Sequence, residues 1–227
     1  MDQTNSFKTA LLGAECWVFD LDNTLYPAST DIFTQVDEKM THFISEFLEL
    51  DFEEAGKVRK DYYLEHGTTL AGLMDLHGMD PNDFLDFVHD IDLSSVAPNP
   101  GLDQSLSRLQ GRKIIFTNGP TDHAVRIMDR LSIGHHFDAV FDIVGADYVP
   151  KPRPEAYQTL VERFRLNPRE TVMVEDLVRN LAPAAAMGMT TVWVRPDGKG
   201  SPENALEADV DHVVDDLVTW LDELTAE

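Results

Sequence analysis

Residues 16–25 read Cys-Trp-Val-Phe-Asp-Leu-Asp-Asn-Thr-Leu, an apolar run that ends in two acids and a polar turn. Trp17, Val18 and Phe19 have the composition of a strand that is buried on both faces of a parallel sheet. Asp20 follows at the carboxyl end of that strand, where ligands bind in open α/β sheets. Asp22 lies two residues later and is expected to face the same place. The pair therefore predicts a functional site at this edge of a sheet.

The composition restricts the partners of the chain. It has 227 residues, of which 43% are hydrophobic, and this is enough for a folded core. The formal net charge is -23, from 18 basic and 41 acidic residues. Nucleic acids and anionic membranes need clustered Lys and Arg, so neither is expected as a partner. An anionic small molecule needs local positive features, such as a metal ion, a lysine or backbone amides at a helix start.

The single cysteine, Cys16, excludes an internal disulfide and a multi-cysteine zinc site. We expect it to be a buried, unreactive thiol. Asp2 and Glu15 argue against a cleaved signal peptide. The uncharged run 181–194 contains a proline and a glycine, and it is too short to span a membrane. These features together predict a cytoplasmic protein.

The second part of the chain, from residue 111 onward, alternates short apolar runs with helical patterns, which indicates βαβ units and a parallel sheet. The predicted strands are 114–116, 171–174 and 191–194, and the predicted helices are 124–131, 154–164 and 181–187. A last short strand is expected at 211–214, before an acidic helix at 215–224.

Residues 30–92 have a different pattern, with no β-branched run and with apolar residues at helical spacing. The first predicted helix is outlined by Ile32, Phe33, Val36, Met40, Phe43, Ile44, Phe47 and Leu48. Three shorter helices follow, and the turn formers at 97–101 mark the return to the main domain. We therefore predict an α/β core made of residues 1–28 and 98–227, with an all-helical insert at 29–97.

The pattern Asp-x-Asp is weak evidence by itself, because it also occurs at 90–92 and 209–211, where surface acids are the simplest interpretation. The context of Asp20 and Asp22 is different, with a hydrophobic strand before them and the polar turn Asn23-Thr24 after them. The alternative for this pair is that the acids only cap the next element.

Three other strand ends carry matching chemistry. The turn Thr117-Asn118-Gly119 precedes a helix expected to start near Thr121, so its amides could hold a phosphate, although an ordinary strand-to-helix turn would look the same. Lys151 lies among three prolines and could pair with a carboxylate or a phosphate, or could be a solvated surface lysine. Glu175 and Asp176 could complete a magnesium site, or could cap the next helix.

The order of these four elements resembles the haloacid dehalogenase (HAD) superfamily of hydrolases. The four matching segments are 19–25 (motif I), 117–118 (motif II), 151–152 (motif III) and 175–176 (motif IV). The resemblance covers nearly the whole chain, and the helical insert looks like the C1-type cap of the superfamily. It implies a Rossmann-like, doubly wound parallel sheet with an inserted helical cap domain.

The resemblance also implies a mechanism. Asp20 would be the nucleophile that forms an aspartyl-phosphate, and Asp22 would be the general acid and then the general base. Thr117 and Lys151 would complete the catalytic set. The implied phosphate ligands are Thr117, Asn118, Gly119 and Lys151. The implied ligands of a magnesium ion are Asp20, Asp22 through its backbone carbonyl, and Asp176, with Glu175 assisting. An acid at Asp22 favours phosphoryl transfer over dehalogenation.

The segments 23–27, 66–73 and 180–181 look like the pyrimidine 5'-nucleotidase branch, which hydrolyses UMP and CMP. Segment 66–73 could equally be a plain turn and helix start. Leu177 and Asn180 depart from residues common in relatives. The alternatives are a phosphatase for phosphoglycolate or a sugar phosphate, a phosphomutase, and a catalytically idle nucleotide-binding module. The histidines 135–136 lack the sequence spacing of a zinc site or a nucleophilic triad.

Overall fold

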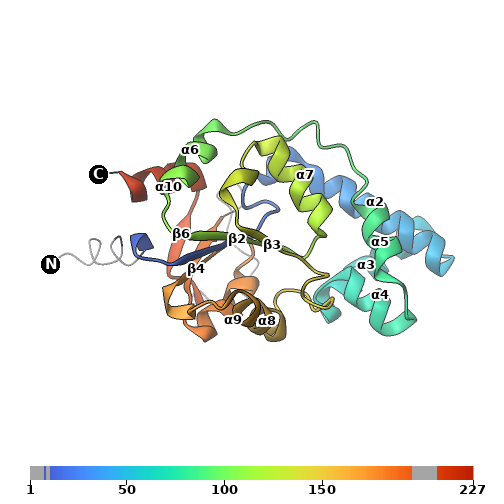
Figure 1. Cartoon of the computed structure of the whole chain (residues 1–227). Helices are drawn as coiled ribbons and strands as arrows, with labels where there is room; N and C mark the ends of the chain where they lie inside the picture. Colours follow the sequence, from blue (N-terminus) through green and yellow to red (C-terminus); the bar gives the residue numbers. More distant parts are fainter. Residues whose placement is uncertain (1–7, 9–10, 196–208, 227) are drawn as a thin grey trace.

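A six-stranded, all-parallel sheet forms the centre of the protein in a computed structural model that describes residues 8, 11–195 and 209–226. The strands lie in the order β3-β2-β1-β4-β5-β6 (Figure 1). Their bounds are β1 Cys16–Phe19, β2 Arg112–Phe116, β3 Ala139–Phe141, β4 Thr171–Glu175, β5 Thr190–Val194 and β6 His212–Val214. This strand order is that of a doubly wound, Rossmann-like sheet, so the predicted fold class is confirmed.

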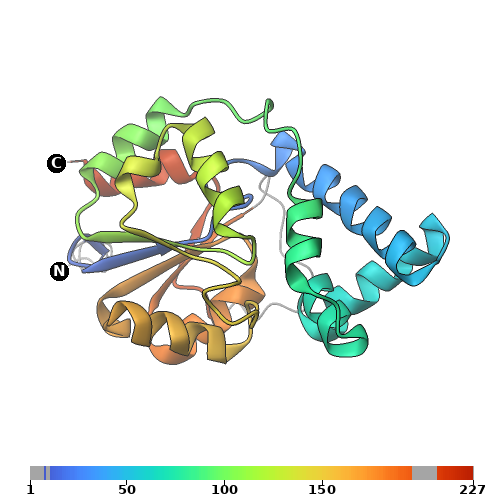
Figure 2. The same cartoon turned by 45° about the vertical axis from the view of Figure 1, so that its right-hand side comes forward.

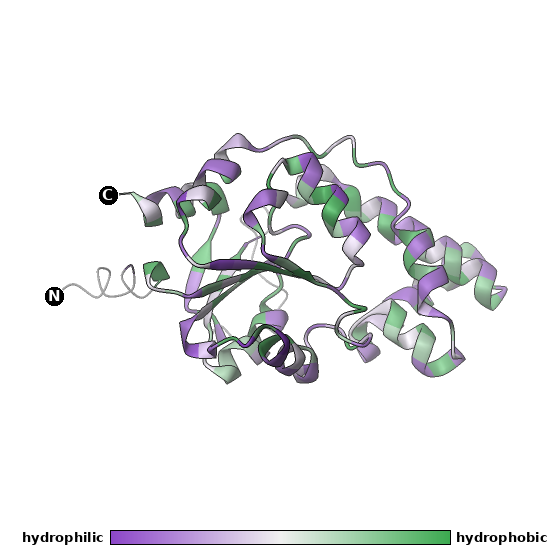
Figure 3. Ribbon diagram, viewed as in Figure 1, coloured by the Kyte–Doolittle hydropathy of each residue, from purple (hydrophilic) through white to green (hydrophobic). Residues whose placement is uncertain are grey.

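Helices cover both faces of the sheet. One face packs against α6 (Pro100–Arg108), α7 (Thr121–Leu131) and α10 (Leu217–Thr225), and the other against α8 (Pro154–Phe164) and α9 (Val178–Met187). Figure 1 shows these two layers above and below the strands. Figure 3 shows green and purple alternating along the helices, as expected for helices with one buried and one exposed face.

The central strand is β1, and it brings Asp20 to the edge of the sheet. All four residues of β1 are buried, as the apolar run predicts. Phe19 is in register with Ile115 of β2 and Val174 of β4, and the amide of Asp20 donates to Val174 O at 2.9 Å. Asp20 therefore emerges between the ends of β2 and β4, where the carboxyl ends of parallel strands meet.

Four of the helices between β1 and β2 share a hydrophobic cluster, which Ile143 from the segment after β3 also joins. We call them the helical insert: α2 Ile32–Leu48, α3 Phe52–His66, α4 Thr69–His77 and α5 Pro81–Val88. Gly72 in α4 permits close packing, because a Cβ there would lie 2.5 Å from Tyr62 Cβ of α3. In Figure 2 the helical insert lies to one side of the sheet and its flanking helices.

Several element boundaries differ from the sequence-based prediction. The three-residue strand β3 was not predicted, because it is too short for a clear periodicity. The turn formers at 97–101 lead directly into α6, whose first helical residue is Pro100 and whose N-cap is Asn99. The last strand and helix begin at His212 and Leu217, two residues or fewer from the predicted positions. Among the described helices, none combines the length and apolar character needed to cross a membrane.

Candidate active site

The site is built around the carboxylate of Asp20, directly after β1. Its Oδ1 accepts a hydrogen bond from Lys151 Nζ at 2.5 Å, and its Oδ2 accepts one from Thr24 Oγ1 at 2.9 Å. The residue is 6% exposed. Burial and the charge of Glu175 raise the pKa of Asp20 to about 7, although Lys151 acts in the opposite direction. The strand end and the two donors fix this carboxylate at the edge of the sheet where the carboxyl ends of the strands meet.

Lys151 is the positive charge of the site and is only 2% exposed, so the surface-lysine interpretation is wrong. Its ammonium group donates to Asp20, to Phe116 O at 2.8 Å and to Glu175 Oε1 at 2.9 Å. Burial opposes its charge, but Asp20 and Glu175 hold the pKa of Lys151 above its usual value. The ammonium therefore stays charged.

Asn118 holds the backbone of Lys151 in place. Its Oδ1 accepts from Lys151 N at 2.8 Å, and its Nδ2 donates to Lys151 O at 3.1 Å. Two loops that are distant in sequence are joined by this pair of bonds, for which no local sequence pattern exists.

Glu175 and Asp176 lie at the end of β4. Glu175 Oε1 accepts from Lys151 and from Asn180 Nδ2 at 2.5 Å, and its Oε2 accepts from Leu177 N at 2.9 Å. Burial opposes its ionisation, yet Lys151 and these hydrogen bonds hold the pKa of Glu175 below its ordinary value. Burial and the charges of Glu175 and Asp20 raise the pKa of Asp176 to about 10.

These three carboxylates fit a divalent cation. Asp20, Glu175 and Asp176 each place a carboxylate oxygen within 4.8 Å of the others. Only one described ammonium, that of Lys151, forms an ion pair with the group, so negative charge is in excess. A hard cation such as Mg²⁺ prefers oxygen ligands of this kind and would offset the repulsion. Three of the four predicted metal ligands are therefore together, and the excess charge of these carboxylates gives a physical reason for an ion.

Asp22 is held by two donors on the same oxygen. Tyr26 Oη donates to Asp22 Oδ1 at 2.6 Å, and His123 Nε2 lies 3.0 Å from that atom. Burial opposes ionisation of this carboxyl, but His123 and the two hydrogen bonds lower the pKa of Asp22 below its ordinary value. Tyr26 follows the turn after β1, and His123 lies in the first turn of α7, so a turn and a helix that are distant in sequence meet at Asp22.

The predicted phosphate turn follows β2. Gly119 N donates to Thr117 Oγ1 at 3.0 Å, and this bond leaves the hydroxyl hydrogen of Thr117 available for a ligand. His89, at the end of α5, has its Nε2 3.5 Å from the position that a Cβ on Gly119 would occupy. Burial and the neighbouring His123 lower the pKa of His89 to about 4. The helical insert thus places a neutral imidazole beside this turn.

A cavity of about 480 Å³ extends from these residues to the helical insert. It is lined by all eight predicted site residues: Asp20, Asp22, Thr117, Asn118, Gly119, Lys151, Glu175 and Asp176. The opposite wall, from the helical insert, includes Phe33, Tyr63, Thr68 and Phe84. The guanidinium of Arg179, in α9, lies 4.2 Å from the ring centre of Tyr63 and connects the two walls. The sequence-predicted residues therefore form one site.

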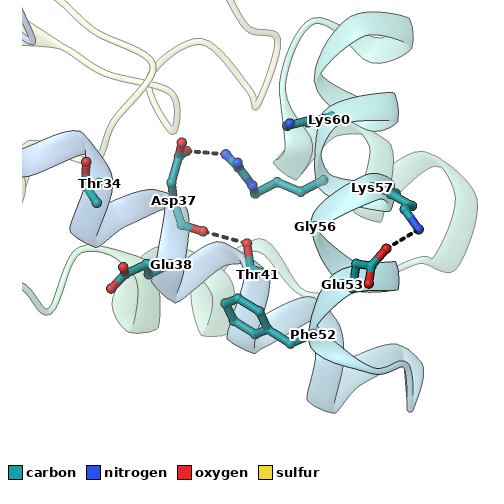
Figure 4. Close-up of a pocket in the computed structure, with 10 residues that line it drawn as sticks. Thr34, Asp37, Glu38, Thr41, Phe52, Glu53, Gly56, Lys57 and Lys60 are labelled. Atoms are coloured by element: carbon teal, nitrogen blue, oxygen red, sulfur yellow. Dashed lines mark hydrogen bonds and ion pairs between the residues drawn. The ribbon is translucent and has the colours of Figure 1, made fainter.

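A second hollow, of about 710 Å³, lies between α2 and α3 (Figure 4). Two ion pairs lie in its wall, since Lys57 pairs with Glu53 at 2.8 Å and Asp37 pairs with Arg59. Asp37 also accepts, through its backbone carbonyl, from Thr41 Oγ1 at 2.8 Å. None of the charged residues that line this hollow is buried, whereas the charged groups of the site at β1, such as Asp20 and Lys151, are.

His135 and His136 lie beside Asp103, although their sequence spacing predicted no metal-ligating group. Asp103 Oδ1 lies 3.2 Å from His135 Nε2 and 2.8 Å from His136 Nε2, so the three side chains do form a group with metal-ligating atoms. The sequence spacing could not show it, because Asp103 is 33 residues before His136. The hydrogen bonds to the carboxylate account for the arrangement.

Four residues of the site were not singled out from the sequence as contacts: Thr24, His89, His123 and Arg179. Thr24 lies four residues after its partner Asp20, and Tyr26 lies four residues after its partner Asp22. This spacing is the one sequence signal that could have indicated these contacts. Thr68 has a local task as the N-cap of α4, accepting from Ala71 N at 3.1 Å, and it also lines the cavity. The two alternatives for segment 66–73 are therefore compatible.

A buried carboxylate at the end of the central strand, a buried ammonium and a cluster of three acids thus lie together at one edge of an α/β sheet. The sequence model of the haloacid dehalogenase-like hydrolase family matches residues 15–188, and the chain belongs to this family. The predicted superfamily is thereby confirmed.

Two curated relatives are similar over most of the chain. Glyceraldehyde 3-phosphate phosphatase of Methanocaldococcus jannaschii is 31% identical over 191 residues, which cover 78% of this chain and 83% of that protein. Phosphate metabolism protein 8 of Saccharomyces cerevisiae is 28% identical over 189 residues, which cover 75% of this chain. The match spans 58% of the yeast protein's length.

The fold is shared with solved structures. A HAD phosphatase from Thermococcus onnurineus aligns with a TM-score of 0.62 and 20% identity, covering 92% of this chain and 97% of that one. At this identity the similarity concerns the fold.

Proposed function

We propose that the chain is a magnesium-dependent phosphomonoester hydrolase that acts through an aspartyl-phosphate on Asp20. The observation that carries this proposal is the position of Asp20 between Lys151 and the acids Glu175 and Asp176, facing the cavity beside Thr117. Family membership and the phosphatase names of the relatives support the same chemistry.

The residues divide the reaction into two displacements. In the first, an Asp20 oxygen forms a bond to phosphorus, the bond from phosphorus to the leaving alcohol oxygen breaks, and Asp22 gives that oxygen a proton. In the second, water attacks phosphorus, Asp22 takes its proton, and phosphate leaves with Asp20 restored. Lys151 and Thr117 stabilise the charge that develops on the transferred group, which is usually the largest catalytic contribution.

The proposed holders of Mg²⁺ are the Asp20 and Asp176 side chains and the Asp22 backbone carbonyl. When bound, the ion would supply the positive charge that lets a carboxylate approach an anionic phosphate. The hydrogen bonds of Glu175 to Lys151, Asn180 and Leu177 support an assisting task for this acid. We further propose that residues 29–97 are a C1-type cap domain, since their helices form one wall of the cavity.

For the substrate we propose a pyrimidine nucleoside 5'-monophosphate. The aromatic rings of Phe33, Tyr63 and Phe84 and the hydroxyl of Thr68 line the cavity. A mostly apolar cavity of this size with a few polar groups is suited to a nucleoside leaving group. The relative named for glyceraldehyde 3-phosphate makes a small sugar phosphate the second candidate. The buried Cys16 supports a cytoplasmic setting for this chemistry.

The test is phosphate release with Mg²⁺ from UMP, CMP, AMP, glyceraldehyde 3-phosphate, fructose 1-phosphate and phosphoglycolate. We expect kcat/KM for UMP and CMP to exceed that for the other compounds by about tenfold or more. A higher value for a sugar phosphate would overturn the nucleotide assignment but not the phosphatase. Retention of phosphate on an isomeric product would indicate a mutase, and no release from any compound would indicate an idle module.

The matched variants are Asp20→Asn and Asp90→Asn. Asp90 belongs to another Asp-x-Asp pattern of the chain, at residues 90–92, and is exposed. We expect loss of turnover in D20N and unchanged turnover in D90N, with removal of Mg²⁺ by EDTA abolishing the activity of both D90N and the wild type. Substantial turnover by D20N would overturn the nucleophile assignment.

A further inference from the structure

We propose that Tyr26 and His123 are positioning residues that occupy Oδ1 of Asp22, so that Oδ2 is the oxygen that carries the proton to and from substrate. This inference rests on the proposed function, because it assigns an atom within the proton transfer of that reaction.

The geometry separates the two oxygens of Asp22. Tyr26 Oη lies 2.6 Å and His123 Nε2 lies 3.0 Å from Oδ1. Among the described residues, no side chain or amide donates to Oδ2. Two donors on Oδ1 lower the electron density available there, whereas Oδ2 keeps its lone pairs for a proton. A carboxylate held by one oxygen in this way can rotate little, and its other oxygen has a fixed direction.

The two donors come from rigid parts of the structure. The turn after β1 is closed by Leu25 N, which donates to Leu21 O at 3.0 Å, and Tyr26 follows this turn and is buried. His123 lies in the first turn of α7 and is buried with 2% exposure. One donor follows the turn after β1 and the other belongs to α7, so a shift of either element would break a bond to Asp22.

The hydrogen positions of His123 follow from its partner. The oxygen Oδ1 of Asp22 accepts hydrogen bonds both in the ionised group and in the group that carries its proton on Oδ2, so Nε2 of His123 carries the hydrogen and Nδ1 has a free lone pair. That Nδ1 is buried and has no hydrogen-bond partner among the described residues. An unpaired buried nitrogen lowers stability. The histidine is therefore poorly explained by stability and better explained by its contact with Asp22.

His89 is arranged so that it does not compete for Asp22. Its Nδ1 donates to Leu85 O at 2.9 Å, which leaves Nε2 without a hydrogen in the neutral ring. The rings of His89 and His123 are 4.8 Å apart, centre to centre. His89 thus covers His123 from the helical insert, while Tyr26 and His123 remain the donors to Asp22.

The test is a series of aryl phosphates with leaving groups of increasing basicity: p-nitrophenyl, p-cyanophenyl, phenyl and p-methoxyphenyl phosphate. A good leaving group such as p-nitrophenolate departs without a proton, whereas a phenolate of high basicity needs one. The constant kcat/KM includes the steps up to release of the phenol, so it isolates the first displacement from hydrolysis of the intermediate. A plot of log kcat/KM against leaving-group pKa then reports the proton transfer.

We compare Tyr26→Phe and His123→Ala with the wild type. We expect kcat/KM for phenyl phosphate to fall by about 10- to 100-fold, because general acid help contributes about 10²- to 10⁴-fold and is only partly lost. The fall for p-nitrophenyl phosphate should be less than about threefold, so the plot becomes steeper. In His123→Gln the side-chain amide can donate to Oδ1, and we expect it to restore part of the wild-type slope.

The matched controls are Tyr62→Phe and His136→Ala, whose side chains bond to His77 and Asp103 and lie outside the cavity. Both controls should keep the wild-type slope. A loss of kcat/KM that is equal for all leaving groups in Y26F and H123A would indicate a merely structural contribution and overturn this inference alone. Absence of turnover of every aryl phosphate by the wild type would overturn the proposed function, and this inference with it.

Discussion

The replacement Asp176→Asn should make the metal-free protein more stable. In the folded protein the pKa of Asp176 is raised from 3.8 to about 10, by burial and by the charges of Glu175 and Asp20. Between these two pH values the unfolded chain has released a proton that the folded protein still holds. The contribution of this group to stability is therefore progressively lost as pH rises through that window. An asparagine has no proton to hold and removes the penalty.

The magnitude follows from the size of the shift. At pH 7 the window extends about 3 units above the ordinary pKa of 3.8, and each unit corresponds to about 1.4 kcal/mol. The upper limit is therefore about 4 kcal/mol. Because Asp20 and Glu175 carry part of the same repulsion, we expect a gain in unfolding free energy of about 1–4 kcal/mol for D176N. At pH 5 the gain should fall to less than about half of its value at pH 7.

The assay is urea unfolding in EDTA at pH 7 and pH 5, followed by tryptophan fluorescence, and then repeated with Mg²⁺. A ligand at 100 times its Kd stabilises the folded state by about 2.7 kcal/mol, and D176N should gain less of this than the wild type. The exposed control Asp86→Asn should stay within about 0.5 kcal/mol of the wild type under all conditions. A D176N protein that is no more stable than the wild type in EDTA at pH 7 would refute the reasoning.

Two further variants test the supports of the site. Lys151→Met should lower the unfolding free energy by about 3–5 kcal/mol at pH 7, because two buried carboxylates lose their countercharge. The loss of stability should be smaller at pH 5, where Asp20 is protonated. Urea unfolding of K151M, beside the exposed control Lys57→Met, measures this loss. Equal losses at both pH values would contradict the expected effect of the countercharge. Asn118→Ala should cost only about 1–2 kcal/mol of stability. Its kcat/KM should nevertheless fall by about tenfold or more, since the Lys151 backbone loses both bonds to Asn118; wild-type kinetics would contradict this.

The sequence predicted the parts of the fold in which one physical signal dominates. The apolar run at 16–19 has no alternative to a buried strand, and the helical spacing at 32–48 has no alternative to an amphipathic helix. The strand β3 was not predicted, because its three residues are too few to show a periodicity. The domain boundaries at 28 and 98 stay a prediction, although α2 begins at Ile32 and α6 at Pro100.

The site was predictable where acids, amides and a lysine follow strands, because parallel strands bring their carboxyl ends together. The supporting contacts were not predictable in the same way. His123 reaches Asp22 across 101 positions of sequence, and Arg179 reaches Tyr63 only because α9 and the helical insert face each other. Such contacts depend on the packing of whole elements, and a single sequence carries no local pattern for them. Tyr26 is the exception, since a turn of four residues returns it to Asp22.

The proposed mechanism depends on a covalent phosphate on Asp20. The most direct test is a rapid acid quench of Asp22→Asn with p-nitrophenyl phosphate and Mg²⁺, followed by borohydride reduction and peptide mapping. Loss of the Asp22 base should slow hydrolysis of the intermediate while this leaving group still departs. The account predicts a burst approaching one p-nitrophenolate per protein and modification of Asp20 alone, neither of which occurs in the D20N/D22N double variant. The mechanism would be contradicted if the wild type turns over the substrate but D22N carries no phosphate on Asp20. Phosphate on another residue of D22N would contradict it as well.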